Sequence, residues 1–307
     1  MKVFITGANG FVGSHLKTYL EFKGMDVFGI GRSECISNFP GYKKIDLLDY
    51  NSLKKFISFV RPEVIFNLAG ISSVKNCTEN PNLCEEINVR GTDNLLQSVV
   101  ETNLNTKIII AGSAEVYGSP DKMPITEEFP LNPRNLYAET KIQQENLCNE
   151  YSDKLDISIL RLFPHIGPGQ KPLFVSSDFA KQIVSIERGL EPVIRVGNLK
   201  AIRDFSDVRD VVEAYWLAYE KGNVGECYNI CSGVVKSINE ILIKLLSFSK
   251  VKITIEKDEN KMRPSDIPIL IGDNNKFVKQ TGWKPKIPLD KTLNDLLNYW
   301  RINKNFT

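Results

Sequence analysis

Tyr137 and Lys141 are the residues whose types and spacing best fit acid–base chemistry in this chain. They stand four positions apart on a predicted helix, so their side chains share one face. An ammonium group near a tyrosine favours the tyrosinate and lowers the tyrosine pKa from about 10. That makes the hydroxyl a proton donor to a carbonyl reduced by hydride transfer. Ser113 completes this candidate catalytic set by orienting the carbonyl with a hydrogen bond.

The spacing alone does not single out this pair, because Tyr19/Lys23 and Tyr50/Lys54 repeat it. Only Tyr137 and Lys141 follow the predicted strand 107–111 and the segment 112–118 that contains Ser113. The pair therefore falls at the carboxyl end of a predicted sheet, where folds of this kind bind ligands.

A glycine-rich loop follows the first predicted strand and opens the first predicted helix. Glycines at such spacings permit a tight turn and a close backbone approach to a pyrophosphate. The helix N-terminus adds free N–H groups and the positive end of its dipole. Three glycines could be mere turn residues, but the strand before them and the helix after them predict a dinucleotide site. The loop residues expected to contact it are Gly7, Asn9, Gly10, Phe11, Val12 and Gly13.

The end of the second predicted strand bears on which dinucleotide binds. NAD sites usually carry Asp or Glu there, whereas an arginine favours the 2′-phosphate of NADP. Here the strand ends in Gly31 and Arg32, and Asp26 stands at its opposite end. The sequence therefore favours NADPH, with NADH as the alternative.

Short apolar runs alternate with helical patterns through the first half of the chain. The predicted strands are residues 3–6, 27–30, 64–68, 107–111 and 157–162, and the predicted helices are 13–22, 52–60, 83–102 and 136–150. Fully apolar runs suit strands that are covered on both faces. Their alternation with helices implies right-handed crossovers, hence an α/β fold with a doubly wound parallel (Rossmann) sheet.

After Phe163 the pattern changes, and proline and glycine cluster in residues 164–172. Helices are predicted at 177–188, 208–221, 238–248 and 289–299, and strands at 193–196 and 251–256. We interpret this half as a smaller, partly interleaved substrate-binding domain. Residues 1–163, with 200–235 contributing, would form the NAD(P)-binding domain, and 164–199 with 236–307 the substrate-binding domain.

Charge and composition exclude several classes of protein. The 39 basic and 37 acidic side chains are well mixed, so no basic face for nucleic acid is expected. No uncharged apolar run approaches the roughly 18 residues of a membrane helix, and the first strand begins too early for a signal peptide. A cytoplasmic protein is expected. The six cysteines form no C-x-x-C pair and only two histidines are present, which predicts reduced thiols and no metal site.

Several motifs together resemble those of extended short-chain dehydrogenase/reductases: the glycine loop, 67–70, 88–92, 112–118 and the Tyr137/Lys141 pair. The resemblance implies a Ser113–Tyr137–Lys141 triad, in which Lys141 also binds the nicotinamide ribose. It implies a homodimer that pairs helices 83–102 and 136–150 of each subunit. The further cofactor contacts that it implies are Asp46, Leu47, Leu68, Ala69, Gly70 and Leu162.

The second half is similar to the sugar-nucleotide 4-keto reductases of this family, through segments 161–170, 178–180, 196–199, 203–205 and 263–266. This implies reduction of the C4 ketone of GDP-4-dehydro-6-deoxy-D-mannose to GDP-D-rhamnose. Arginines suit the diphosphate of such a substrate. The implied substrate contacts are Ser73, Ser113, Arg195, Arg203, Arg263 and Asp266. For Arg203 and Arg263, surface ion pairs with Asp207 or Asp266 are the alternative.

Two positions depart from the pattern or point elsewhere. Pro164 stands where many relatives have Asn, which removes a side chain able to contact the substrate. Glu115 occupies the position of a catalytic Glu in related 4,6-dehydratases, so GDP-mannose 4,6-dehydratase activity is an alternative. A reductase for a dTDP-linked 4-keto sugar and a non-catalytic NADP-binding sensor are two more.

Overall fold

The computed structural model describes residues 1–35, 39–262 and 267–303. Its largest element is a seven-stranded parallel sheet with strand order β11-β6-β5-β4-β1-β2-β3. The strands are β1 Lys2–Thr6, β2 Asp26–Gly31, β3 Tyr42–Lys44, β4 Val64–Asn67, β5 Lys107–Ser113, β6 Asp156–Leu162 and β11 Cys227–Ile230. The predicted doubly wound sheet is confirmed; β3 and β11 were not predicted.

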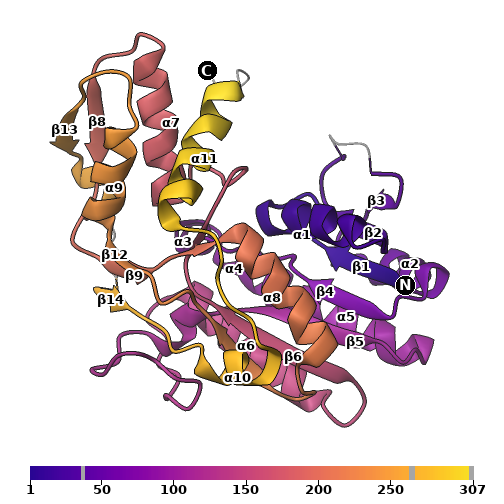
Figure 1. Ribbon diagram of the computed structural model, residues 1–307. Helices are drawn as coiled ribbons and strands as arrows, with labels where there is room; N and C mark the ends of the chain where they lie inside the picture. Colours follow the sequence, from indigo (N-terminus) through magenta and orange to yellow (C-terminus); the bar gives the residue numbers. More distant parts are fainter. Residues whose placement is uncertain (36–38, 263–266, 304–307) are drawn as a thin grey trace.

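Helices cover both faces of this sheet (Figure 1). In β1, Val3 and Ile5 enter one core and Phe4 enters the other, as the two-residue period of a strand requires. The first face is covered by α1 (Phe11–Phe22) and α8 (Val208–Lys221), with α10 (Asn275–Thr281) beside β11. The second is covered by α2 (Tyr50–Val60), α5 (Gly91–Thr102) and α6 (Leu136–Glu150).

The helix predicted at 83–102 is interrupted in the structure. It consists of α4 (Pro81–Glu85), a π-helical turn η1 (Glu86–Arg90) and α5, and the short α3 (Val74–Glu79) precedes it. A π-helical turn inside a helix commonly marks a functional site. Here it carries Asn88, whose buried side chain bonds to both the N–H and the C=O of Ile71.

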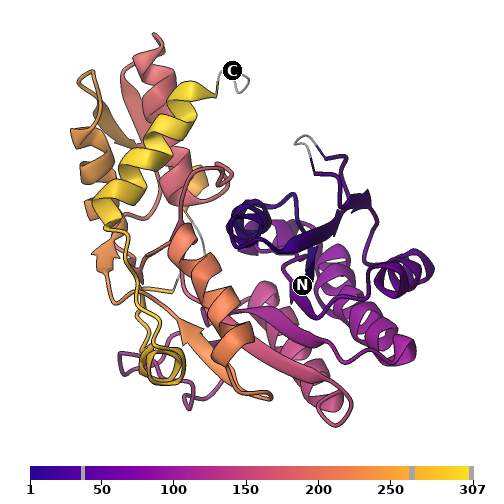
Figure 2. The same ribbon diagram turned by 45° about the vertical axis from the view of Figure 1, so that its right-hand side comes forward.

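A smaller lobe stands at the upper left of both Figure 1 and Figure 2. Three helices, α7 (Val175–Glu187), α9 (Ile238–Ser247) and α11 (Leu289–Ile302), pack with the parallel pair β8 (Val193–Val196) and β13 (Thr254–Lys257). Its core contains Phe179, Ile241, Leu297 and Trp300. None of the described helices combines the length and apolar composition that a membrane crossing requires.

Short strands link the two lobes. β7 (His165–Ile166) pairs with β10 (Ser206–Asp207), while β9 (Ile202–Asp204) lies between β12 (Val235–Ser237) and β14 (Ile269–Leu270). Two 3-10 turns, η2 (Ala114–Tyr117) and η3 (Glu259–Lys261), complete the described elements. Phe277 of α10 and Trp283 pack into the core of the large sheet, so the C-terminal third contributes to both lobes.

Candidate active site

The residues that the sequence singled out meet at the carboxyl edge of the large sheet. The glycine loop follows β1, Leu68, Ala69 and Gly70 follow β4, Ser113 ends β5, and Leu162 ends β6. Strand order reverses between β1 and β4, and such a switch point is where open α/β sheets bind ligands.

The glycine loop is shaped to let a ligand approach the backbone. Gly7 has φ +67°, and a Cβ there would lie 2.9 Å from the Ala69 nitrogen. A Cβ on Gly13 would lie 2.3 Å from the Gly7 oxygen. Helix α1 begins at Phe11 after Gly10, with no side-chain cap on its first turn. This cradle of small residues and uncapped N–H groups fits a dinucleotide pyrophosphate.

One ring stack and one amide hold the loop in place. The Phe11 ring stacks on the His165 ring at a centroid distance of 5.9 Å, so His165 packs the loop rather than standing open. The Asn9 side chain reaches the segment after β2, where its Nδ2 lies 3.5 Å from the Ser33 oxygen. Arg32 lies exposed in that same segment, next to the loop.

The predicted adenine contacts follow β3 at the same edge. The Leu47 side chain is buried, and its carbonyl accepts a hydrogen bond of 2.8 Å from Asn94 Nδ2. Asp46 Oδ1 accepts from the Leu48 nitrogen at 3.0 Å, which shapes the turn.

Tyr137 and Ser113 are in contact at the centre of this edge. The Tyr137 side chain is buried, and burial raises its pKa to about 12, against the lowering effect of a hydrogen bond with Ser113. The charge of Glu115 adds to the rise in the Tyr137 pKa. The sequence predicted that the lysine lowers the Tyr137 pKa, and for this state of the protein that prediction is wrong. Tyr137 keeps its proton at neutral pH.

The Lys141 ammonium is fixed in place by two hydrogen bonds. Its Nζ donates to the Ala111 carbonyl oxygen at 2.7 Å and to Gln144 Oε1 at 2.9 Å, so the ammonium is held by neutral acceptors. Burial lowers the Lys141 pKa to about 8, and the charge of Glu145 opposes that shift. A Cβ on Gly70 would lie 3.8 Å from the Lys141 Nζ, which places the ammonium beside the segment after β4.

Glu115 is tied to the start of α6. Asn135 caps α6 by accepting from the Ala138 nitrogen at 2.9 Å, and its Nδ2 donates to Glu115 Oε2 at 3.1 Å. The Glu115 nitrogen donates to Ser113 Oγ at 3.2 Å. Ser113, Glu115 and the N-terminus of α6 therefore form one connected group.

The implied substrate residues are spread over both lobes. Ser73 is buried and caps α3, accepting from the Asn76 nitrogen at 3.3 Å. Arg195 is half-exposed on β8 and forms ion pairs with Glu191 at 3.2 Å and Glu256 at 4.0 Å.

Arg203 lies nearly buried on β9 and donates to the Ile202 oxygen at 2.9 Å and the Pro268 oxygen at 3.4 Å. Asp207, the alternative partner considered for it, forms its ion pair with Arg209 at 2.6 Å. Arg263 and Asp266 lie outside the described residues.

A buried set of polar side chains runs beneath the edge and was missed by the sequence analysis. Gln144 Nε2 donates to Thr92 Oγ1 at 2.7 Å, and Thr92 Oγ1 donates to the Asn88 oxygen at 2.8 Å. Gln144 stands three residues after Lys141 on one helix face, the only signal in the sequence that could have pointed to it.

The same set continues to the glycine loop. Asn67 Nδ2 donates to Thr92 Oγ1 at 3.3 Å, and Thr6 Oγ1 donates to Asn67 Oδ1 at 2.6 Å. Thr6 Oγ1 also accepts from the Ala69 nitrogen at 3.1 Å. We call Thr6, Asn67, Thr92 and Gln144 the polar ladder; it connects α6 to the strand ends that bear the glycine loop.

The prediction of reduced thiols is wrong for one pair, because Cys77 and Cys84 form a disulfide. Asn80 ends α3 and begins the turn into α4, which brings the two Cα atoms to 5.1 Å, within the range that a disulfide bridges. The two cysteines are seven residues apart, which is not the C-x-x-C spacing. Their pairing depends instead on this turn. The two cysteines pack against Tyr137 in one buried cluster.

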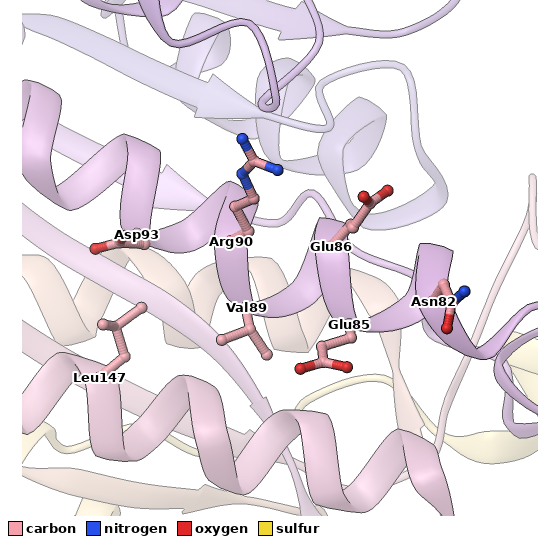
Figure 3. A pocket seen from close by; sticks show the side chains of 7 residues that line it. All are labelled: Asn82, Glu85, Glu86, Val89, Arg90, Asp93 and Leu147. Carbon is pink, nitrogen blue, oxygen red and sulfur yellow. The ribbon is translucent and has the colours of Figure 1, made fainter.

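A hollow lies farther along α6, between that helix and the α4–η1–α5 run (Figure 3). Val89 and Leu147 face one another across it, with Glu85 and Asp93 on either side. Leu147 follows Tyr137 by ten residues, or about 15 Å along a helix, so the hollow is separate from the carboxyl edge. Among the described residues, no group of three or more His, Cys, Asp or Glu side chains could hold a metal ion.

The sheet order, the glycine cradle and the Ser113, Tyr137 and Lys141 arrangement define an extended short-chain dehydrogenase/reductase. Within that class, the chain belongs to the GDP-mannose 4,6 dehydratase family, whose model matches residues 4–296.

Individual relatives agree with this family. The chain is 33% identical to the GDP-6-deoxy-D-mannose reductase of Pseudomonas aeruginosa, over 97% of each chain. The structure of RMD from Pseudomonas aeruginosa complexed with NADPH matches with a TM-score of 0.88 and 32% identity, covering 98% of both chains. The UDP-glucose 4-epimerase of Thermus thermophilus complexed with NAD matches with a TM-score of 0.89 and 26% identity, covering 98% and 99%.

Proposed function

We propose that this chain reduces the C4 ketone of GDP-4-dehydro-6-deoxy-D-mannose to the alcohol of GDP-D-rhamnose, with NADPH preferred and NADH as the alternative. The observation that carries the proposal is the buried, protonated Tyr137 in contact with Ser113 at the edge that holds the glycine cradle. The 33% identity to a GDP-6-deoxy-D-mannose reductase supports the choice of substrate.

In the proposed reaction, bound NADPH supplies the hydride that C4 receives. Ser113 orients the ketone oxygen by donating a hydrogen bond to it. Tyr137 donates its hydroxyl proton to the alkoxide that develops on this oxygen, which is general acid catalysis. Lys141, four residues along the same helix, would favour the tyrosinate that remains and would bind the nicotinamide ribose.

The cofactor is assigned to the edge residues of the large sheet. The glycine loop would hold the pyrophosphate, Arg32 the 2′-phosphate, and Asp46 and Leu47 the adenine. Leu68, Ala69, Gly70 and Leu162 would line the cofactor at the ends of β4 and β6. The uncapped N-terminus of α1 and the exposed Arg32 support this assignment.

The substrate is assigned to residues between the edge and the smaller lobe. Ser73 and Ser113 would contact the sugar, Arg203 and Arg263 the nucleotide diphosphate, and Arg195 and Asp266 other parts of the substrate. We retain the proposed division of the chain into an NAD(P)-binding part (1–163, with 200–235) and a substrate-binding part (164–199 and 236–307). We also propose a cytoplasmic homodimer, for which the hollow between α6 and the α4–η1–α5 run is a candidate contact surface.

Replacement of Tyr137 by Phe tests the proposed reaction. We expect the turnover of the 4-keto sugar to fall at least about 100-fold, because the proton donor is lost. NADPH affinity, measured by fluorescence titration, should stay within about two-fold, since the ring remains.

Tyr50→Phe is the matched control, because Tyr50 and Lys54 have the same spacing but lie on α2. Its turnover should equal that of the wild type. Undiminished turnover by Tyr137→Phe would contradict the role of Tyr137.

Glu115 favours a second candidate function, GDP-mannose 4,6-dehydratase. Its carboxylate acts on the Tyr137 pKa and is held by Asn135, so an acid–base group stands beside the proposed ketone site. Incubation with GDP-mannose and catalytic NADP separates the two candidates. Accumulation of the 4-keto sugar without added NADPH would favour the dehydratase, whereas consumption of NADPH with the 4-keto sugar supplied favours the reductase.

The identity of the nucleotide base in the substrate is tested separately. A parallel assay with the dTDP-linked 4-keto-6-deoxy sugar tests it, with NMR of the product to establish the configuration at C4. NADPH oxidation with the dTDP sugar but not the GDP sugar would overturn the proposed substrate.

A further inference from the structure

Among the residues that the structure describes, Gln144 is the one side chain that accepts a hydrogen bond from the Lys141 ammonium. Its Oε1 accepts from Lys141 Nζ at 2.9 Å, and the Ala111 carbonyl oxygen accepts from the same nitrogen at 2.7 Å. Gln144 itself is 1% exposed. An ammonium has three hydrogens, so two are held from below and the third can turn toward Gly70 and the cradle.

The polar ladder determines which way the Gln144 amide points. The Asn88 carbonyl oxygen can only accept a hydrogen bond, so the Thr92 hydroxyl must donate its single hydrogen to that oxygen. Thr92 Oγ1 must therefore accept from Gln144, which requires the amide nitrogen on its side. The amide oxygen is then turned to Lys141.

We propose that Gln144 is a positioning residue: through the polar ladder, its amide oxygen holds the Lys141 ammonium, in charged form, at the carboxyl edge beside Tyr137. The inference rests on the proposed role of Lys141 in ketone reduction. Gln144 touches neither the ketone nor the cofactor in this arrangement; it acts through Lys141.

The other charged groups near Lys141 should not mask the effect of Gln144 on the Lys141 pKa. On its own helix, Lys141 faces Glu145, Cys148 and Tyr137. Glu145 is already held by Arg161 of β6 at 2.7 Å.

The elements packed on α6 add few charges. Glu115 from η2 faces Tyr137, whereas β5 and η1 present a neutral carbonyl and the neutral Asn88 amide. Loss of the Gln144 oxygen would leave the ammonium with one held hydrogen in buried surroundings, which disfavours the charged form.

Two substitutions of opposite effect test the inference. Gln144→Met keeps the size and removes the acceptor, so the Lys141 pKa should fall by about one pH unit, as expected for loss of a hydrogen bond to a charged group. Gln144→Glu places a carboxylate against the ammonium, so the same pKa should rise by about one pH unit or more. Gln143→Met and Gln143→Glu are matched controls, because Gln143 is the exposed neighbour on the same helix.

The first measurement is independent of turnover. In protein labelled with 13C at lysine Cε, the Lys141 resonance is identified by its absence in Lys141→Met and followed against pH by NMR. Opposite displacements of its titration in the two Gln144 variants, with none in the Gln143 variants, support the inference. An unchanged titration, or displacement of both in one direction, would overturn it, whether or not the 4-keto sugar is the substrate.

The second measurement is the pH profile of ketone reduction. The basic limb of kcat should move down in Gln144→Met and up in Gln144→Glu, while KM for the sugar changes less than about two-fold. A role confined to packing would lower kcat evenly at every pH. Wild-type protein that turns over no 4-keto sugar would overturn the proposed function, and the NMR titration would still decide the role of Gln144.

Discussion

At the scale of single residues, burial moves Tyr137 and Lys141 toward their neutral forms. It raises the pKa of Tyr137 to about 12 and lowers that of Lys141 to about 8. At neutral pH, Tyr137 is therefore a protonated acid, and Lys141 is still largely an ammonium near the limit of its charged range. A site in this state is set to give a proton to a ketone rather than to take one from an alcohol.

This arrangement predicts the pH dependence of reduction. Below about pH 8 Lys141 is charged and Tyr137 protonated, so the rate should be level from pH 6 to 7. Above about pH 8 the ammonium loses its proton and the rate should fall, although Tyr137 itself remains protonated.

Steady-state kinetics from pH 6 to 10 measure this dependence. Lys141→Arg should have no decline in this range, because a guanidinium keeps its charge. A wild-type rate that rises from pH 8 to 10 would contradict the assignment.

At the scale of elements, one ion pair fastens α6 to β6. Arg161 of β6 donates from Nε and from a terminal nitrogen to the two oxygens of Glu145, at 3.0 and 2.7 Å. Its other terminal nitrogen donates to the Tyr117 hydroxyl at 2.8 Å. Both side chains of the pair are buried, so each charge depends on the other for its stability. We call the Arg161–Glu145 ion pair the clamp; it holds the helix that bears Tyr137 and Lys141.

Removal of one partner of this clamp should be costly. Arg161→Met leaves the Glu145 carboxylate buried and unpaired, and we expect the free energy of unfolding to fall by about 3–5 kcal/mol. Urea unfolding at pH 7 measures the change. The double variant Arg161→Met/Glu145→Gln removes both charges and should recover most of the loss. A single variant within about 1 kcal/mol of wild type would disprove the structural importance of the pair.

Helices and strands whose apolar residues recur at a regular spacing were predictable from the sequence. Contacts between these elements were not. Helix 208–221 and strand 193–196 match their predicted bounds, because apolar side chains recur at helical or strand spacing over the whole run. β7 and β10 contain only two residues each, too few for a period to be visible.

The candidate site divides in the same way. The glycine loop and Tyr137/Lys141 were predictable because each lies within a local motif. The hydrogen bond between Gln144 and Thr92 depends on how α5 and α6 pack, and the Cys77–Cys84 bond depends on the turn between α3 and α4. No sequence motif encodes either one. The direction of the Tyr137 pKa was missed because burial is a property of the folded chain.

At the scale of the whole molecule, the proposed homodimer makes a prediction about the hollow between α6 and the α4–η1–α5 run. Val89 and Leu147 would be covered by the partner subunit, so Leu147→Glu should bury a further carboxylate near Glu85 and Asp93 and yield monomers in analytical ultracentrifugation. Ile243→Glu is the control, since Ile243 is an exposed apolar residue of α9 in the other lobe. A wild-type protein that sediments as a monomer would refute the dimer.

The seventh strand, β11, has a consequence for how this protein is made. The ribosome must complete three quarters of the chain before β11 can pair with β6 and α8 can cover the face formed by Val3, Ile5 and Phe66. Until then, that face of the nascent sheet has α1 but lacks α8. The nucleotide-binding half therefore cannot finish folding during its own synthesis. A fragment that ends near residue 163 would expose an aggregation-prone apolar surface.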